Sequence, residues 1–173
     1  MTIKPATALN EFLQIHELNY KTFAEEIPQH RQNAEKKLVD KFHNKNQYII
    51  AKKQEKVIGM VCYNMQRPFS LDEKLSDLDS YLPECRKLAE IRLLAVHKDE
   101  RKITVTYRLL KYLCKVLIEQ RTDAAVISGT TRQLRLYKSM GFIPFGPLVG
   151  NLNASYQPMY ITIKELRNDF KND

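Results

Sequence analysis

The chain has 173 residues, of which 43% are hydrophobic and 28% are charged, and its formal net charge is +8. This length allows one domain with a sizeable core, and the composition excludes a disordered chain. No apolar run reaches the roughly 18 residues that a membrane-spanning helix needs, and no apolar segment near the N-terminus predicts a secretory signal. We therefore expect a single domain covering residues 1–173.

The three cysteines, Cys62, Cys85 and Cys114, are far apart and odd in number. They form no CxxC pair and no metal-ligand spacing, so the sequence predicts reduced thiols, no metal site and a cytoplasmic protein. Charge is uneven, since ten Lys and Arg stand against four Asp and Glu in residues 98–138, a local excess of +6. Such a patch suits a phosphorylated cofactor, an acidic protein, nucleic acid, an anionic membrane or only a solvated face.

The first part of the chain predicts two helices and a hairpin. Apolar residues recur at helical spacing in residues 9–27, and Pro28 ends this helix. A second amphipathic helix is expected over residues 31–43. It would bury three apolar side chains, Ala34, Leu38 and Phe42. Residues 47–53 and 56–65 then read as two strands joined by a short polar turn.

The rest of the chain alternates between predicted strands and helices after a long loop. Residues 66–87 form this loop, in which four leucines at helical spacing predict one short helix. The expected strands are residues 88–97, 124–128, 142–145 and 156–163, and the expected helices are residues 104–120 and 132–140. Gly141 stops the second of these helices. The order predicts an α/β sandwich with a mixed sheet.

Two strings stand out in this second part. The string LYKSMGF (residues 136–142) ends the short helix, and EIRLLAV (residues 90–96) lies in the central strand, five residues before Arg101. The first string resembles the LYEKLGF signature of the GNAT (Gcn5-related N-acetyltransferase) superfamily. The order of strand, basic loop, long helix, strand, short helix and Tyr-x-x-x-Gly-Phe is also similar to that family, over about residues 47–145.

This resemblance implies a GNAT fold, in which helices flank a mixed, mostly antiparallel central sheet. It also implies an acyltransferase that moves an acyl group from a thioester donor to an amine. In such an enzyme Glu90 is the candidate base that accepts the proton of the amine, and Tyr137 is the candidate acid that protonates the departing thiolate. Glu90 has purely structural alternatives, which are pairing with Arg92 or a position at the sheet edge. His97 is a weaker candidate for a second base.

The donor is expected to bind along the end of the strand and the start of the long helix. Backbone N–H groups at a helix N-terminus are unsatisfied and lie at the positive end of the helix dipole, so they bind phosphate. Strand backbone would hold the pantetheine arm and polarise the thioester carbonyl. The candidate donor-binding residues are Leu94, Ala95, Val96, Arg101, Lys102, Ile103, Thr104, Val105 and Thr106.

One departure from the family pattern affects this donor loop. Thr104 and Thr106 occupy the two positions at which the R/Q-x-x-G-x-G/A loop of the family has small residues, and Thr130 stands where many members carry Asn. A β-branched residue obstructs the close approach of a pyrophosphate that glycine permits. Either the donor is not gripped through a full coenzyme A pyrophosphate, or the loop is rearranged, or the protein is inactive.

A closer resemblance favours the first of these options. The strings YKTFAEEIP (residues 20–28), EIRLLAV, GFIPFGP (residues 141–147) and QPMY (residues 157–160) look like those of the N-acyl amino acid synthase branch. This branch is related to acyl-homoserine lactone synthases and uses acyl chains carried on acyl carrier protein. Such a donor has one phosphodiester and no pyrophosphate, and the acidic carrier would meet the basic patch well.

The leading hypothesis is thus an N-acyltransferase that uses acyl-CoA or acyl carrier protein as donor and a small-molecule amine, such as an amino acid, as acceptor. The first alternative is a catalytically degenerate GNAT-fold module that binds an acyl thioester without transferring it. The second alternative, a nucleic-acid-binding domain, depends on charge alone and predicts steeply salt-dependent binding.

Overall fold

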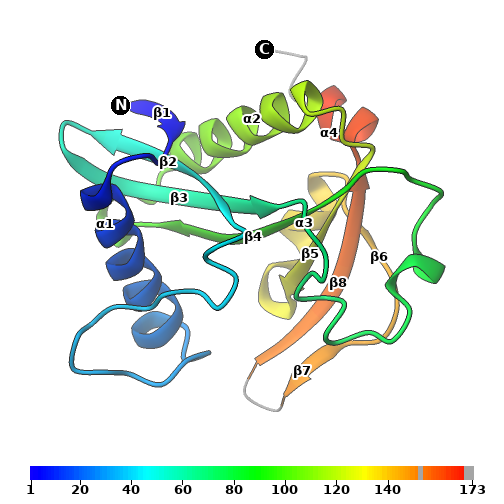
Figure 1. The fold of residues 1–173 in the computed structure, drawn as a ribbon, viewed down its shortest axis with the longest axis horizontal. Coiled ribbons are helices and arrows are strands. Elements are labelled where there is room, and N and C mark those ends of the chain that lie inside the picture. Colours follow the sequence, from blue (N-terminus) through cyan, green and yellow to red (C-terminus); the bar gives the residue numbers. More distant parts are fainter. Residues whose placement is uncertain (152–153, 170–173) are drawn as a thin grey trace. The chain divides into compact units, whose positions relative to one another are not determined.

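The computed structural model describes residues 1–151 and 154–169, which form a mixed sheet of eight strands with flanking helices (Figure 1). The strands are β1 (Thr2–Pro5), β2 (Gln47–Lys53), β3 (Lys56–Asn64), β4 (Leu88–Val96), β5 (Ala124–Thr130), β6 (Ile143–Pro144), β7 (Val149–Asn151) and β8 (Ala154–Thr162). The helices are α1 (Leu9–Tyr20), the π-helix η1 (Lys21–Glu26), the 3₁₀ helices η2 (Leu78–Tyr81), η3 (Lys98–Glu100) and η4 (Thr131–Gln133), α2 (Ile103–Glu119), α3 (Leu134–Ser139) and α4 (Ile163–Asp169).

Hydrogen bonds connect the strands in the order β1-β2-β3-β4-β5-β8-β6, with β7 paired to β8. The β4–β5 ladder is parallel, whereas the ladders of β1 with β2, of β2 with β3 and of β8 with its neighbours β5, β6 and β7 are antiparallel. The mixed, mostly antiparallel sheet that the sequence predicted is therefore confirmed. No helix within the described residues is both long and apolar enough to cross a membrane.

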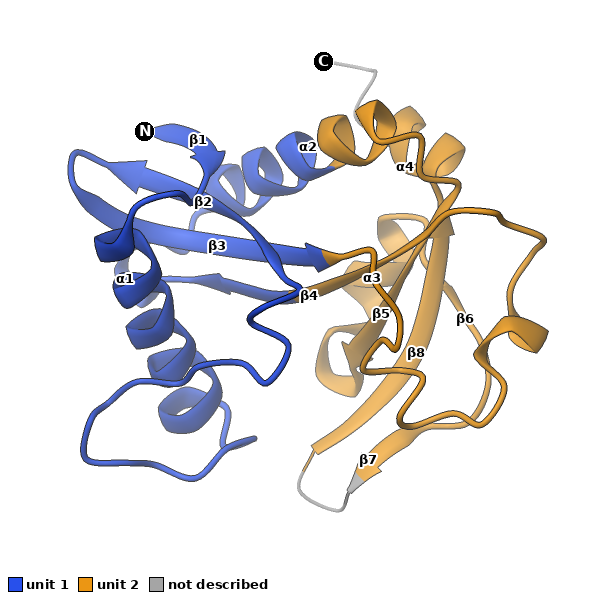
Figure 2. Ribbon diagram, in the orientation of Figure 1, with its two compact units in different colours: residues 1–63, 93–113 blue, residues 64–92, 114–173 orange. Residues whose placement is uncertain are grey.

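The chain divides into two compact units (Figure 2). Unit 1 contains Met1–Tyr63 and Leu93–Leu113, and unit 2 contains Asn64–Arg92 and Cys114–Asp173. Strand β4 and helix α2 each contribute residues to both units. The expectation of one domain over residues 1–173 stays a prediction.

The core of unit 1 forms where α1 packs on the strands. Ile15 and Leu18 of α1 share a buried cluster with Ile50, Met60 and Ala95 of β2, β3 and β4. The predicted first helix is confirmed, but not all of its apolar residues are buried. Leu9 and Leu13 lie 76% and 40% exposed, whereas Glu11, Ile15 and Leu18 are buried.

The predicted helix over residues 31–43 is wrong, because this segment consists of turns and irregular backbone. Side chains take the backbone groups that a helix would use: Asn33 donates to the Lys37 carbonyl at 2.8 Å and accepts from the Lys37 N–H at 3.3 Å. Asp40 accepts from the Phe42 N–H at 3.0 Å. Asn and Asp favour such local bonds over helix interiors. Of the three expected core residues, Phe42 is buried, Leu38 is half-buried and Ala34 is exposed.

Unit 2 is built around β5 and the long loop before β4. Phe69 and Leu71 of the loop pack with Val126 of β5 and with Phe145. The short helix expected in this loop is η2, whose Leu78 belongs to the same cluster. The loop that the sequence predicted is therefore a packed part of the core, and its first residues are fixed against the sheet.

The other predicted elements are found within a few residues of their expected bounds, and several short elements were missed. The strands at 88–97, 124–128, 142–145 and 156–163 correspond to β4, β5, β6 and β8, and the helices at 104–120 and 132–140 to α2 and α3. Strands β1 and β7 and helix α4 had no prediction, since each is too short to carry a periodic pattern.

Helix α2 packs closely on β3 within unit 1. Its buried residues include Val105 and Leu109, which face Gly59 of β3. A Cβ atom at Gly59 would lie 3.2 Å from Leu109 Cδ1 and 3.3 Å from both Val105 Cγ1 and Val96 Cγ2. The absence of a side chain at Gly59 thus allows the first turns of α2 to lie against β3.

Candidate functional site

The strand segment expected to hold the donor follows an interruption in β4. The β4–β5 register pairs Leu88, Ala89 and Glu90 with Ala124–Val126 of β5. Leu93 then adopts a left-handed backbone conformation, with φ of +52°, which is unusual for a residue with a branched side chain. After it come Leu94, which is half-buried, and Ala95 and Val96, which are buried. The predicted donor-binding strand residues therefore lie beyond a local break in regular strand geometry.

The predicted phosphate loop leads from β4 into α2. Arg101 and Lys102 precede the helix, which begins at Ile103. Lys102, Ile103 and Thr104 are exposed, with Ile103 at 82%, whereas Val105 is buried and Thr106 is half-buried. The Val105 N–H bonds to the Lys102 carbonyl at 3.0 Å, whereas the exposure of Ile103 and Thr104 leaves the start of the helix accessible to an anion. The threonine side chains at 104 and 106 lie in this same turn.

The side chain of Arg101 is already held inside unit 1. Its guanidinium forms an ion pair with Glu26, the last residue of the π-helix η1. Its Nε donates a hydrogen bond of 3.1 Å to the carbonyl oxygen of Val96. Arg101 is thus bonded both to a carboxylate and to one of the backbone carbonyls expected to face the pantetheine arm.

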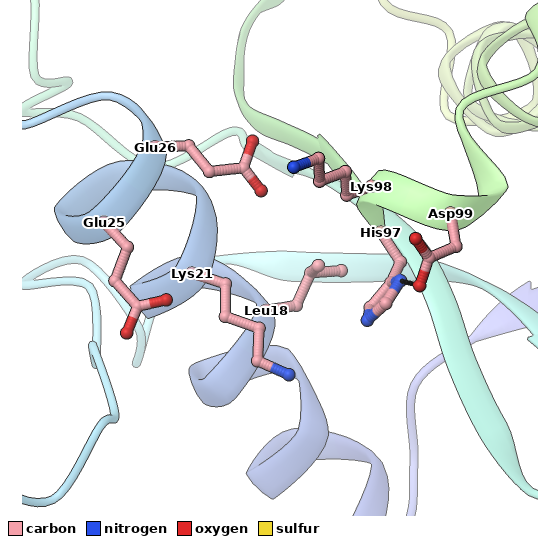
Figure 3. Close-up of a pocket in the computed structure, with 7 residues that line it drawn as sticks. All are labelled: Leu18, Lys21, Glu25, Glu26, His97, Lys98 and Asp99. Carbon is pink, nitrogen blue, oxygen red and sulfur yellow. Dashed lines mark ion pairs between the residues drawn. The ribbon is translucent and has the colours of Figure 1, made fainter.

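A pocket of about 310 Å³ opens beside this loop in unit 1 (Figure 3). One wall comes from α1 and η1 and the other from the segment that follows β4. The lining residues are Leu18, Lys21, Glu25, Glu26, His97, Lys98 and Asp99. His97 Nδ1 lies 3.6 Å from a carboxylate oxygen of Asp99. Both signs of charge therefore meet in one small space, directly after the predicted donor strand.

The Glu90 carboxylate is fully enclosed in unit 2, with a side chain only 1% exposed. Oε1 accepts hydrogen bonds from Ser70 Oγ at 2.5 Å and from the Leu71 N–H at 3.1 Å. Oε2 accepts from the Ser70 N–H at 3.0 Å and lies 3.6 Å from Arg92 Nε. The carboxylate therefore anchors the start of the long loop to β4. The structural alternative of pairing with Arg92 is present in the geometry, together with these three stronger contacts.

Tyr137 lies on α3, with its ring against Gly129 of β5. A Cβ atom at Gly129 would be 2.9 Å from Tyr137 Cδ2, and the Tyr137 ring also makes an edge contact with Phe142. Its hydroxyl donates to Gln133 Oε1 at 3.1 Å. Burial raises the pKa of Tyr137, although a hydrogen bond with Thr130 acts in the opposite direction. The phenol therefore stays protonated at neutral pH, as a proton donor must.

The two candidate catalytic residues lie on opposite faces of β5 within unit 2. Glu90 is paired in register with Val126, whose side chain packs with Phe69 and Leu71 on one face. Gly129, three residues further on, faces Tyr137, because side chains alternate along a strand. The other candidates, Leu94–Val96 and 101–106, belong to unit 1.

Several residues at these places were missed by sequence reasoning. Ser70 and Leu71 bind Glu90 from about twenty positions away, and no local pattern marks such a long-range contact. Glu26 belongs to the string YKTFAEEIP, which was noted only for its resemblance to the synthase branch. The same string contains Lys21 and Glu25, which line the pocket and are four positions apart on the helix. Within the described part of the chain, no group of three or more His, Cys, Asp or Glu could hold a metal ion.

Comparison with known protein families identifies the family of this chain. The family model described as Acetyltransferase (GNAT) family matches residues 11–142, well over half of the chain. The chain belongs to this family. As a GNAT member it is an acyltransferase, and the family predicted from LYKSMGF and EIRLLAV is confirmed. No curated protein matches this sequence significantly.

Solved structures of the same fold include the branch that the sequence pointed to. FeeM, an N-acyl amino acid synthase from uncultured soil microbes, is 17% identical with a TM-score of 0.78, covering 97% of this chain and 98% of FeeM. BjaI, a CoA-dependent acyl-homoserine lactone synthase solved with SAM and isopentyl-CoA, is 19% identical with a TM-score of 0.77, covering 96% and 86%. An aminoglycoside 6′-N-acetyltransferase complexed with coenzyme A is 16% identical with a TM-score of 0.66, covering 94% and 97%.

Proposed function

We propose that this GNAT enzyme is an N-acyltransferase that moves an acyl group from a thioester, either acyl-CoA or acyl carrier protein, to the primary amine of a small molecule such as an amino acid. The observation that carries the proposal is the exposed start of α2, where Ile103 and Thr104 begin the helix and the exposed Lys102 precedes it. This turn offers N–H groups and positive charge to a phosphate of the donor.

Two observations bear on the choice of donor. Thr104 and Thr106 place branched side chains in the loop, and this favours a donor with one phosphodiester over one with a pyrophosphate. The local excess of +6 in residues 98–138 favours an acidic carrier protein as partner. In the other direction, BjaI is described as CoA-dependent, so a related fold accepts coenzyme A. Both donors therefore belong to the proposal.

The proposed reaction assigns one proton transfer to each candidate residue. The amine nitrogen attacks the thioester carbonyl carbon, and the C–S bond breaks to give an amide and a thiolate. Backbone N–H groups of Leu94–Val96 stabilise the oxyanion, and Tyr137 gives its phenol proton to the thiolate. The proton of the amine passes to Glu90. Since the carboxylate is enclosed, this proton travels through the Ser70 hydroxyl, which lies 2.5 Å from Oε1.

The test is a matrix of donors and acceptors with the full chain. Coenzyme A thioesters and acyl carrier protein thioesters, each with short and long acyl chains, are mixed with a panel of amines, and thiol release is followed. We expect turnover with at least one pair and a new amide product by mass spectrometry. Tight donor binding without turnover for every pair would instead support the degenerate thioester-binding module.

The cytoplasmic location is also a proposal. The described cysteines Cys62, Cys85 and Cys114 are all free thiols, which suits a reducing compartment. Fractionation of cells that express the chain at its natural level, followed by immunodetection, would test the location.

A further inference from the structure

A charged clamp, formed by Arg67, Asp72 and Asp79, holds the start of the loop between β3 and β4 in unit 2 (Figure 2). The Arg67 guanidinium pairs with Asp72 through Nε, at 3.1 Å, and through Nη2. Its Nη1 donates to both carboxylate oxygens of Asp79, at 2.7 and 2.8 Å. One cation therefore joins two carboxylates that lie 5 and 12 positions later in the chain.

The geometry of this clamp distinguishes it from an isolated surface ion pair. Arg67 is 39% exposed and Asp72 only 19%. A single exposed pair stabilises little, whereas a planar guanidinium bonded to two carboxylates forms a network of fixed orientation. Burial raises the pKa of Asp72, but the bonds from Arg67 and from the Phe69 N–H lower it below its usual value. The carboxylate of Asp72 is therefore charged at neutral pH.

The clamp is connected to Glu90 through a short piece of backbone. The Asp72 oxygen that accepts from Arg67 Nε also accepts from the Phe69 N–H, at 2.6 Å. The next two residues along the chain supply the N–H groups and the hydroxyl that bind the Glu90 carboxylate. Residues 69–71 are thus fixed between two carboxylates, and one of these is itself held by the guanidinium.

Apolar packing alone does not account for the orientation of this turn. Phe69 and Leu71 are 1% and 0% exposed and pack with Val126 of β5. Burial of apolar surface is non-directional, so it holds the turn against the sheet without aiming the hydroxyl of Ser70. Proton transfer requires the two heavy atoms within hydrogen-bond reach of one another. The directed bonds to Asp72 supply the orientation that packing does not.

We propose that Arg67 and Asp72 are positioning residues for the acyl transfer, because their clamp aims the Ser70 hydroxyl at the Glu90 carboxylate. The inference rests on the proposed N-acyltransferase function and adds to it two residues that act through Ser70. It separates two effects of breaking the clamp. The proton transfer slows, since Ser70 is no longer held in line, whereas binding of donor and acceptor stays as it is.

The test measures backbone protection and kinetics on the same variants of the full chain. In Arg67→Gln and in Asp72→Ala we expect the Ser70 and Leu71 amides to exchange about tenfold faster by NMR. With the best donor and acceptor, kcat of the folded protein should fall about tenfold to 100-fold, and both KM values should stay within about twofold. Arg67→Lys should recover part of both losses, because an ammonium still binds Asp72.

Two matched controls come from the same loop. Arg86→Gln and Asp77→Ala alter exposed residues outside the clamp, and both variants should exchange and turn over like the unaltered chain. Unchanged exchange in Arg67→Gln and Asp72→Ala would overturn the inference. Faster exchange with normal kcat would also overturn it, since the clamp would then be structural only, while the proposed function would stand. No turnover by the unaltered chain would be a different result, which overturns the proposed function and the positioning role with it.

Discussion

The guanidinium of Arg101 forms an ion pair with the carboxylate of Glu26, which lies 75 positions earlier in the chain. The same side chain donates a hydrogen bond to the Val96 carbonyl, so two partners hold it although it is 45% exposed. A donor phosphate at the start of α2 would have to compete with Glu26 for this cation. The ion pair therefore sets a cost on donor binding.

Replacing Glu26 tests this competition. We expect Glu26→Gln to bind a phosphorylated donor about twofold to fivefold more tightly, because Arg101 then has no rival anion, and we expect the gain to shrink at high salt. Stability should change by less than about 1 kcal/mol, since both side chains are partly exposed. Titration of coenzyme A and of phosphopantetheine at two salt concentrations measures the effect. Glu17→Gln, an exposed carboxylate of α1, is the control, and identical affinities in both variants would contradict the prediction.

Tyr137 and Gly129 form a second testable pair. Tyr137→Phe should lower kcat by about 100-fold if the phenol protonates the thiolate, with little change in stability. Gly129→Ala should also lower kcat, because its Cβ would lie 2.9 Å from the tyrosine ring and displace it. Steady-state kinetics with the best donor and acceptor measure both effects. Tyr112→Phe, on the half-buried part of α2, serves as control. Unchanged kcat in Tyr137→Phe would remove it from the mechanism.

The Glu90 cluster separates a catalytic from a structural role. Glu90→Gln should reduce the free energy of unfolding by about 1–3 kcal/mol, because an amide nitrogen would then face the donors of Ser70 and Leu71. If Glu90 is the base, kcat of the folded protein should fall as well, by about 100-fold. Ser70→Ala removes one hydrogen bond and the proposed proton path. Chemical denaturation and kinetics on each variant give the two readouts, and a loss of stability with normal kcat would leave Glu90 as an anchor only.

The sequence predicted the elements that depend on contacts between nearby residues, and it did not predict contacts between residues far apart in the chain. The strand at β4, helix α2 and the Tyr137 helix carry clear local patterns, and all were found within a few residues. The segment 31–43 has a helical apolar spacing as well, but Asn33 and Asp40 bind nearby backbone groups and prevent the helix. Spacing alone does not register such side-chain competition.

The candidate site shows the same limit more strongly. Residue types marked Glu90, Tyr137 and Arg101 as chemically interesting, yet their partners Ser70, Gly129 and Glu26 come from distant or unremarkable positions. The partners decide what each group is free to do. The loop before β4 hydrogen-bonds the Glu90 carboxylate, and the π-helix supplies the carboxylate that pairs with Arg101. Only the tertiary structure shows these contacts.

The buried carboxylate of Glu11 predicts how the stability of the protein depends on pH. Its side chain is 2% exposed and is bound by Lys4 at 2.6 Å, by Lys52 at 3.2 Å and by the N–H groups of Thr7 and Ala8. Burial raises the pKa of this carboxyl, but the four hydrogen bonds outweigh burial and lower the pKa from 4.5 to about 2. The charged form is thus favoured in the folded state. The cluster joins β1, α1 and β2 of unit 1.

A carboxyl whose pKa falls on folding stabilises the protein above its unfolded pKa and loses this effect as the pH drops towards the folded value. Glu11 should therefore contribute its full stabilisation, up to about 3 kcal/mol, above pH 5, and lose it progressively between about pH 4.5 and 2. Urea unfolding at pH 7, 4 and 3 should show the unaltered chain losing stability faster than Glu11→Gln. A difference between the two proteins that stays constant over this range would mean that Glu11 is not held charged by its partners, because only a shifted pKa makes their stabilities converge in acid.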